Sequence, residues 1–100
     1  MQYKLNKAGY VLVKSPDHPN AVNGYVLQHR IVVEEYIERL LKPEECIHHI
    51  DMDKTHNSIN NLMLFKTAKE HSAFHIKVRR FGFTGAVLLQ IQNRWATLLS

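Results

Sequence analysis

Five of the seven histidines in this 100-residue chain lie between Glu45 and His75, so this stretch carries most of the residues that can do chemistry. His48 and His49 are adjacent, and His71 and His75 are four residues apart. Neutral imidazole is a common metal ligand and a common general base near neutral pH. The stretch therefore predicts a metal site built from histidines.

The adjacent histidines lie in a short apolar run, residues 46–50, which we expect to be a strand. Successive side chains of a strand point to opposite faces, so His48 and His49 have different tasks. One of them can hold a metal while the other faces a water molecule or a substrate.

The second pair lies on a predicted helix. Thr67 and Glu70 form a capping box, in which each side chain bonds an exposed backbone N–H, and this predicts a helix over residues 68–80. His71 and His75 then lie on one helical face, where two imidazoles can reach one ion.

A polar loop, residues 51–60, connects the two halves of the stretch. It superficially resembles a calcium loop. However, His56 and Leu62 stand where an EF-hand needs glycine and glutamate, so we exclude that site and expect a turn. Residues 61–65 are apolar after Asn61 and predict a second strand that forms a hairpin with 46–50.

The chain before this stretch predicts a long-looped hairpin and a helix. The strands are expected at 9–14 and 24–27, with His18 solvated in the loop between them. Apolar residues recur at helical spacing over 28–41, and Pro43 stops that helix.

The chain after it begins with three basic residues, Lys77, Arg79 and Arg80. A break at 81–85 follows. Apolar residues at helical spacing then predict a C-terminal helix that packs on the domain or meets a partner; they are Leu88, Ile91, Trp95 and Leu98.

Composition limits the class of protein. One hundred residues predict one small domain, and the apolar and charged fractions, 45% and 22%, are typical of globular proteins. The single Cys46 excludes an internal disulfide and is typical of a reducing cytosol. No secretory signal or membrane span is expected. The net charge of +4 is compatible with a polyanionic partner.

Three segments resemble the HNH endonucleases, also called ββα-metal nucleases, and in particular their small phage-encoded and homing-type members. The segments are H-H-I-D-M-D-K-T-H-N-S-I-N-N-L-M-L-F at 48–65, E-H-S-A-F-H at 70–75 and G-Y-V-L-Q-H-R-I-V-V-E-E at 24–35. The resemblance covers roughly residues 9–76 and does not include the tail from Phe81.

The resemblance implies an α+β fold of the ββα-metal nuclease type. We expect an N-terminal hairpin plus helix at 9–44, the ββα-metal core at 45–80 and a C-terminal helical tail at 81–100. It further implies three metal ligands, His48, His71 and His75, and a general base, His49.

The resemblance assigns Asn61 to orient the base, although Asn57 and Asn60 are alternatives. In many relatives the last ligand falls one residue earlier, at the position of Glu70. Here we assign His71 to the metal and Glu70 to the helix cap.

The implied function is a metal-dependent DNA endonuclease or nickase that uses one divalent ion, Mg²⁺, Mn²⁺, Ni²⁺ or Zn²⁺. DNA is the expected partner, contacted by His29, Arg30, Lys77, Arg79 and Arg80. The resemblance also implies a phage-encoded protein in the cytoplasm of a bacterial host. A second copy or another phage protein is the partner that the apolar face of the tail would meet.

Two other functions fit the same residues. One is a DNA-binding module in which a ββα unit holds a structural zinc, and the other is an inhibitor or regulator built on a decayed nuclease. His49 discriminates between the enzyme and the zinc module, because a purely structural site does not need an additional histidine beside its ligand.

Overall fold

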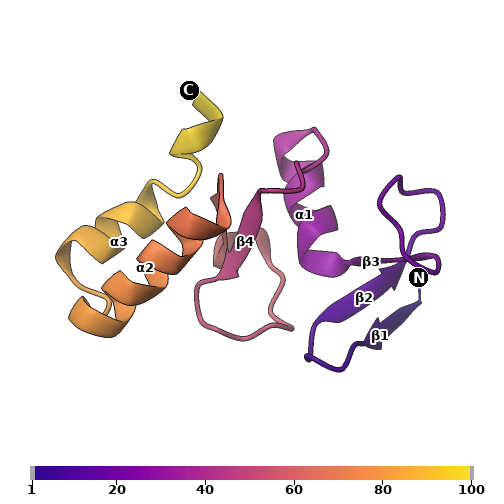
Figure 1. Ribbon diagram of the computed structural model, residues 1–100, viewed down its shortest axis with the longest axis horizontal. Coiled ribbons are helices and arrows are strands. Elements are labelled where there is room, and N and C mark those ends of the chain that lie inside the picture. The colour runs from indigo at the N-terminus through magenta and orange to yellow at the C-terminus, as the bar shows by residue number, and fades with distance from the viewer. Residues whose placement is uncertain (1, 100) are drawn as a thin grey trace.

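The computed structural model describes residues 2–99 and has an α+β architecture with three α-helices and two small antiparallel sheets (Figure 1). In chain order the elements are β1 (Tyr3–Leu5), β2 (Val11–Lys14), β3 (Tyr25–Leu27), α1 (Gln28–Ile37), β4 (Cys46–His49), β5 (Leu62–Phe65), α2 (Ala68–Phe81) and α3 (Gly85–Gln92), with short 3-10 helices at Ile59–Asn61 and Ala96–Leu99. None of the helices in residues 2–99 is long and apolar enough to cross a bilayer.

The N-terminal sheet has the strand order β1–β2–β3. The two predicted strands are confirmed as β2 and β3, whereas β1 was not predicted. Its three residues are exposed, and they become a strand by pairing with β2, for example Leu5 opposite Val11. A short exposed segment of this kind carries no alternation that sequence analysis can detect.

Helix α1 ends at Ile37, four residues before the predicted end. Glu38 adopts a left-handed backbone conformation, with φ of 58°, and stops the helix. Leu41 is nevertheless buried, and its backbone N–H donates to Glu34 Oε2 at 2.9 Å. The other Glu34 oxygen lies 2.6 Å from His18 Nε2, so the prediction of a solvated His18 is wrong.

The β4–β5 hairpin lies in the middle of the molecule, between α1 on one side and α2 with α3 on the other (Figure 1). All four residues of β5 are buried, and they alternate between two hydrophobic clusters. The cluster on the α1 side contains Val33, Leu41, Leu62 and Leu64, and the cluster on the other side contains Met63, Phe65, Phe74 and Val87.

Helix α2 starts at Ala68, as the capping box predicts. The Glu70 backbone N–H donates to Thr67 Oγ1 at 3.3 Å, and Glu70 Oε2 accepts from the Lys66 N–H at 3.2 Å. In the usual capping box the glutamate accepts from the N–H of the N-cap residue, which here is Thr67. Glu70 instead accepts from the N–H of the residue before Thr67. These contacts fix the start of the helix and hence the direction of its histidines.

The C-terminal segment packs back on the domain. Helix α3 ends at Gln92, so the predicted tail helix is shorter than the apolar spacing suggested. The Arg94 guanidinium then donates to the Leu62 carbonyl at 3.0 Å. The Trp95 ring lies 5.1 Å from the Tyr36 ring of α1, measured between centroids.

Candidate metal centre

Three imidazoles from two elements converge beside the hairpin. His48 comes from β4, and His71 and His75 come from successive turns of α2. His71 Nε2 lies 3.1 Å from His48 Nδ1 and 3.0 Å from His75 Nε2. One ligand atom from each of the three residues lies within 4.8 Å of the others, so these histidines are close enough to hold one metal ion.

The separations of these nitrogens fit a shared ion. Two donors at about 2.0–2.1 Å from a metal lie about 2.9 Å apart at a right angle and about 3.3 Å apart at a tetrahedral angle. The two short separations, 3.1 Å and 3.0 Å, fall in that range. His71 Nε2 carries at most one hydrogen, so it cannot donate a hydrogen bond to both His48 and His75. A cation between the three nitrogens would attract all three lone pairs and so relieve their repulsion better than one proton does.

The surroundings keep His48 and His71 in the neutral form that can bind a metal. Burial, followed by the nearby His75, His71 and His49, lowers the pKa of His48 to about 4. Burial and His75 also lower the pKa of His71. Neutral imidazole is the ligand form, so the site is ready for a cation at neutral pH.

Two phenylalanines hold the ligand rings. Phe65 stacks on His71 with 5.3 Å between ring centroids, and Phe74 meets His48 edge-on at 5.2 Å. Both phenylalanines belong to the hydrophobic cluster between β5 and α2. The ligands are therefore oriented by the core itself.

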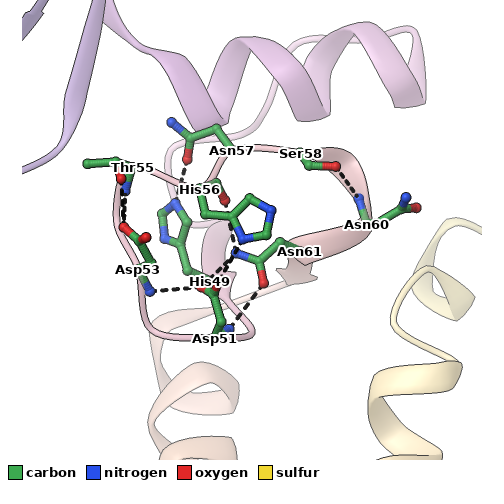
Figure 2. A network of polar contacts seen from close by, with 9 residues as sticks. All are labelled: His49, Asp51, Asp53, Thr55, His56, Asn57, Ser58, Asn60 and Asn61. Carbon is green, nitrogen blue, oxygen red and sulfur yellow. Dashed lines mark hydrogen bonds and ion pairs between the residues drawn. The ribbon is translucent and has the colours of Figure 1, made fainter.

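His49 lies on the other face of β4, as the strand alternation predicts. It stands opposite Leu62 in the hairpin register, on the α1 side, whereas His48 stands opposite Met63, on the α2 side. His49 Nε2 lies 2.6 Å from Asn57 Oδ1 (Figure 2). A carbonyl oxygen only accepts, so Nε2 carries the proton.

Asn57 is itself held in one orientation. Its amide nitrogen donates to Gln28 Oε1 at 2.8 Å, which points its oxygen toward His49. Neutral His49 is therefore the Nε2–H tautomer, and its Nδ1 carries the lone pair. This is the arrangement that a general base requires, because one nitrogen is anchored and the other can accept a proton.

The assignment of Asn61 as the partner of His49 is a prediction that the structure corrects. Asn61 instead braces the loop, because its amide nitrogen donates to Asp51 Oδ1 at 2.8 Å and to the His56 carbonyl at 2.9 Å (Figure 2). Its oxygen accepts from the Asp51 N–H at 3.1 Å. Asn57, one of the two alternatives, is the residue that contacts the histidine.

Two residues expected to contact DNA have other surroundings. His29 is only 6% exposed and meets His49 edge-on, with 5.0 Å between ring centroids. Arg30 donates to the carbonyls of Glu45 and Lys42 and so ties α1 to the turn before β4. His29 therefore lies behind the candidate base, and Arg30 has a structural role.

A shallow pocket of about 90 Å³ joins the three clustered histidines to His49. It is lined by Tyr10, Ile47, His48, His49, Met52, Lys54, His71 and His75. Larger hollows exist elsewhere, but this one contains the whole histidine constellation.

Tyr10 and Lys54 were not predicted as residues of the site. The Lys54 ammonium donates to the Ala8 carbonyl at 2.9 Å, a contact between residues 46 positions apart. No local pattern reports a contact of that range.

The three basic residues near the C-terminal end of α2, Lys77, Arg79 and Arg80, are all exposed, but they do not act as one group. The Lys77 ammonium donates to Gln90 Oε1 of α3 at 3.3 Å. Arg79 follows His75 by four residues, whereas Arg80 is turned to the other side of the helix.

Comparisons with protein-family models, with curated proteins and with solved structures found no match to this chain.

Proposed function

We propose that this protein is a metal-dependent DNA endonuclease or nickase of the ββα-metal (HNH) class. The observation that carries the proposal is that His49, with its tautomer set by Asn57, opens into the same pocket as the three convergent imidazoles. The order of elements β4, β5 and α2 around these residues agrees with the resemblance of residues 48–75 to that class.

His49 serves as the general base. Its Nδ1 takes a proton from the attacking water, and the anchored Nε2–H keeps the ring from turning as positive charge develops. Asn57 is neutral, so it accepts the hydrogen bond without holding a full counter-charge beside the base.

His48, His71 and His75 hold the divalent ion. When bound, that ion supplies Lewis-acid stabilisation of the scissile phosphate and of the leaving 3′-oxygen. Structural zinc sites are closed by four protein ligands, whereas the described residues offer a cluster of three, which leaves coordination positions open. This difference favours an enzyme over a DNA-binding module with a structural zinc. Three imidazoles also suit zinc or nickel better than magnesium.

Supercoiled plasmid tests the proposal. We expect the wild-type chain to convert it to nicked or linear DNA with at least one of Mg²⁺, Mn²⁺, Ni²⁺ and Zn²⁺, and EDTA to abolish the reaction. DNA ligase should reseal the nicks, because hydrolysis at the 3′-oxygen leaves 5′-phosphate and 3′-hydroxyl ends.

Two variants make the assay specific. His71→Ala removes one of the convergent nitrogens and should lose cleavage, whereas His56→Ala removes an exposed histidine outside the cluster and should retain it. If the wild type binds DNA and metal but cuts with none of the four ions, the zinc-module alternative is favoured.

A further inference from the structure

Lys54 forms part of the rim of the histidine pocket. Its ammonium donates to the Ala8 carbonyl at 2.9 Å and lies 4.9 Å from the centre of the Tyr10 ring. An ammonium has three N–H donors, and one bond to a carbonyl leaves the others for a ligand. Within residues 2–99 no carboxylate pairs with it. Lys54 is therefore a positioned, uncompensated positive charge at the pocket.

Helix α2 forms the other wall of the pocket through His71 and His75. Arg79 follows His75 by the same four residues that separate His75 from His71, so it continues that stripe one turn further. Arg80 lies about 180° around the helix from His71, at about 100° per residue. Lys77 is turned toward α3, where it bonds Gln90.

These two cations belong to opposite walls. The loop between β4 and β5, which carries Lys54, reaches toward the β1–β2 turn, and α2 lies on the other side of β4 (Figure 1). A chain of phosphates laid over the histidine pocket would then have Lys54, which lines the pocket, on one side and Arg79, one helical turn beyond His75, on the other. The exposed arginine and the exposed lysine both have the chemistry for phosphate contacts.

We propose that Lys54 and Arg79 form a two-sided clamp for the sugar–phosphate backbone of DNA, which holds one strand across the histidine pocket. This inference rests on the proposed function in that DNA is the substrate. It goes further because it divides the basic residues into those that hold DNA and those that do not. Contacts of this kind position the strand without reading its sequence.

Binding of a fluorescein-labelled DNA duplex, measured by fluorescence anisotropy, tests the clamp. All variants carry His49→Ala and are measured with metal present, so that the DNA is not consumed. Lys54→Met keeps the aliphatic stem over Tyr10 and removes the charge, and Arg79→Met removes the charge on α2. Each should weaken binding roughly threefold to tenfold and lower the slope of log K against log salt by about 1.

Two matched controls remove the same charge elsewhere. Lys4 lies over the Tyr25 ring at 4.0 Å, much as Lys54 lies over Tyr10, and Arg80 is on α2 beside Arg79. Lys4→Met and Arg80→Met should change affinity by less than about twofold and leave the salt slope unchanged. Lys54→Arg should restore affinity, which shows that the charge and not the loop is responsible.

The clamp is overturned if the Lys54→Met and Arg79→Met variants bind as the two controls do, or if the parent protein does not bind DNA. It stands if the two clamp variants alone lose affinity. Binding and cleavage are measured separately, so the two proposals fail in different ways. Clamp-dependent binding without any nicking contradicts only the nuclease, and nicking with unaltered variant binding contradicts only the clamp.

Discussion

His29 is a buried histidine whose Nδ1 has no hydrogen-bond partner among the described residues. Its ring packs against both Tyr10 and His49, with centroid separations of 5.4 Å and 5.0 Å. Burial, then the charges of His49 and Arg30, lower the pKa of His29 to about 4. A neutral ring here supports His49 by packing and does not place a second cation beside it.

The low pKa of His29 makes stability depend on pH. The unfolded chain binds a proton near pH 6.5 and the folded chain only near pH 4, so the stabilisation is fully present above about pH 6.5 and is lost as pH falls toward about 4. For this one group the loss between about pH 7 and about pH 5 is roughly 2 kcal/mol.

The His29→Phe variant keeps a ring in the same place and removes the titration. We expect its free energy of unfolding in urea, measured in EDTA, to fall less between those two pH values than that of the wild type. His48 and His71 titrate in both proteins, so the difference between them isolates His29. If the free energies of unfolding of the wild type and the variant differ by the same amount at both pH values, His29 is not the source of the pH dependence.

At the scale of single residues, the sequence predicts which histidines lie together more reliably than it predicts their hydrogen-bond partners. The three converging histidines and His49 were all chosen correctly as neighbours, because strand alternation and i, i+4 spacing are local geometry. The choice between Asn57 and Asn61 depends on how a ten-residue loop folds, and local geometry does not determine that. The burial of His29 depends on contacts with Tyr10 and His49, which are distant in sequence.

A bound metal would join two elements, since His48 belongs to β4 while His71 and His75 belong to α2. A metal that binds only the folded state stabilises that state by about 2.7 kcal/mol when its concentration is a hundredfold above Kd. In a domain of about 100 residues this corresponds to a rise in Tm of roughly 10–20 °C.

Thermal unfolding followed by circular dichroism, with zinc or with EDTA, measures this link. The wild type should show the rise, and His71→Ala should lose most of it. His56→Ala should keep it, because that side chain lies outside the cluster. An equal rise in all three proteins would mean that the metal binds elsewhere.

Elements with a local cause were predicted and the others were not. Helix α2 follows from the capping box at Thr67, and the hairpin follows from two apolar runs around a turn-forming loop. Helix α1 ends early because Glu38 adopts a left-handed conformation, and the Leu41 N–H then donates to the Glu34 carboxylate, a contact that the apolar spacing does not encode. The strand β1 depends on its partner β2.

In the whole molecule the β4–β5 hairpin separates two hydrophobic clusters, and the candidate site lies at the hairpin, whose strand β4 directs His48 to one side and His49 to the other. The C-terminal segment from residue 81 packs on both clusters. Val87 belongs to one of them, and Trp95 packs against the other. Sequence analysis left open whether the tail packs or meets a partner. Amphipathic spacing shows that a helix has an apolar face but not which surface covers it.

The distribution of charge also appears only at this scale. The net charge of +4 is compatible with a polyanionic partner but does not locate the surface that would bind it. The fold places Arg30 in a structural contact, turns Lys77 and Arg80 away from the histidine stripe, and brings Lys54 to the pocket. The candidate DNA path therefore follows from tertiary structure and not from the spacing of basic residues.

The rate at which His49→Ala nicks supercoiled plasmid, compared with wild type at equal bound metal per chain, tests the proposed nuclease most directly. Loss of a general base lowers the rate about 100-fold or more. We therefore predict a fall of at least that size, while metal content and DNA affinity stay at wild-type values. A His49→Ala protein that nicks within a few-fold of the wild-type rate would contradict the assignment of His49 as the base.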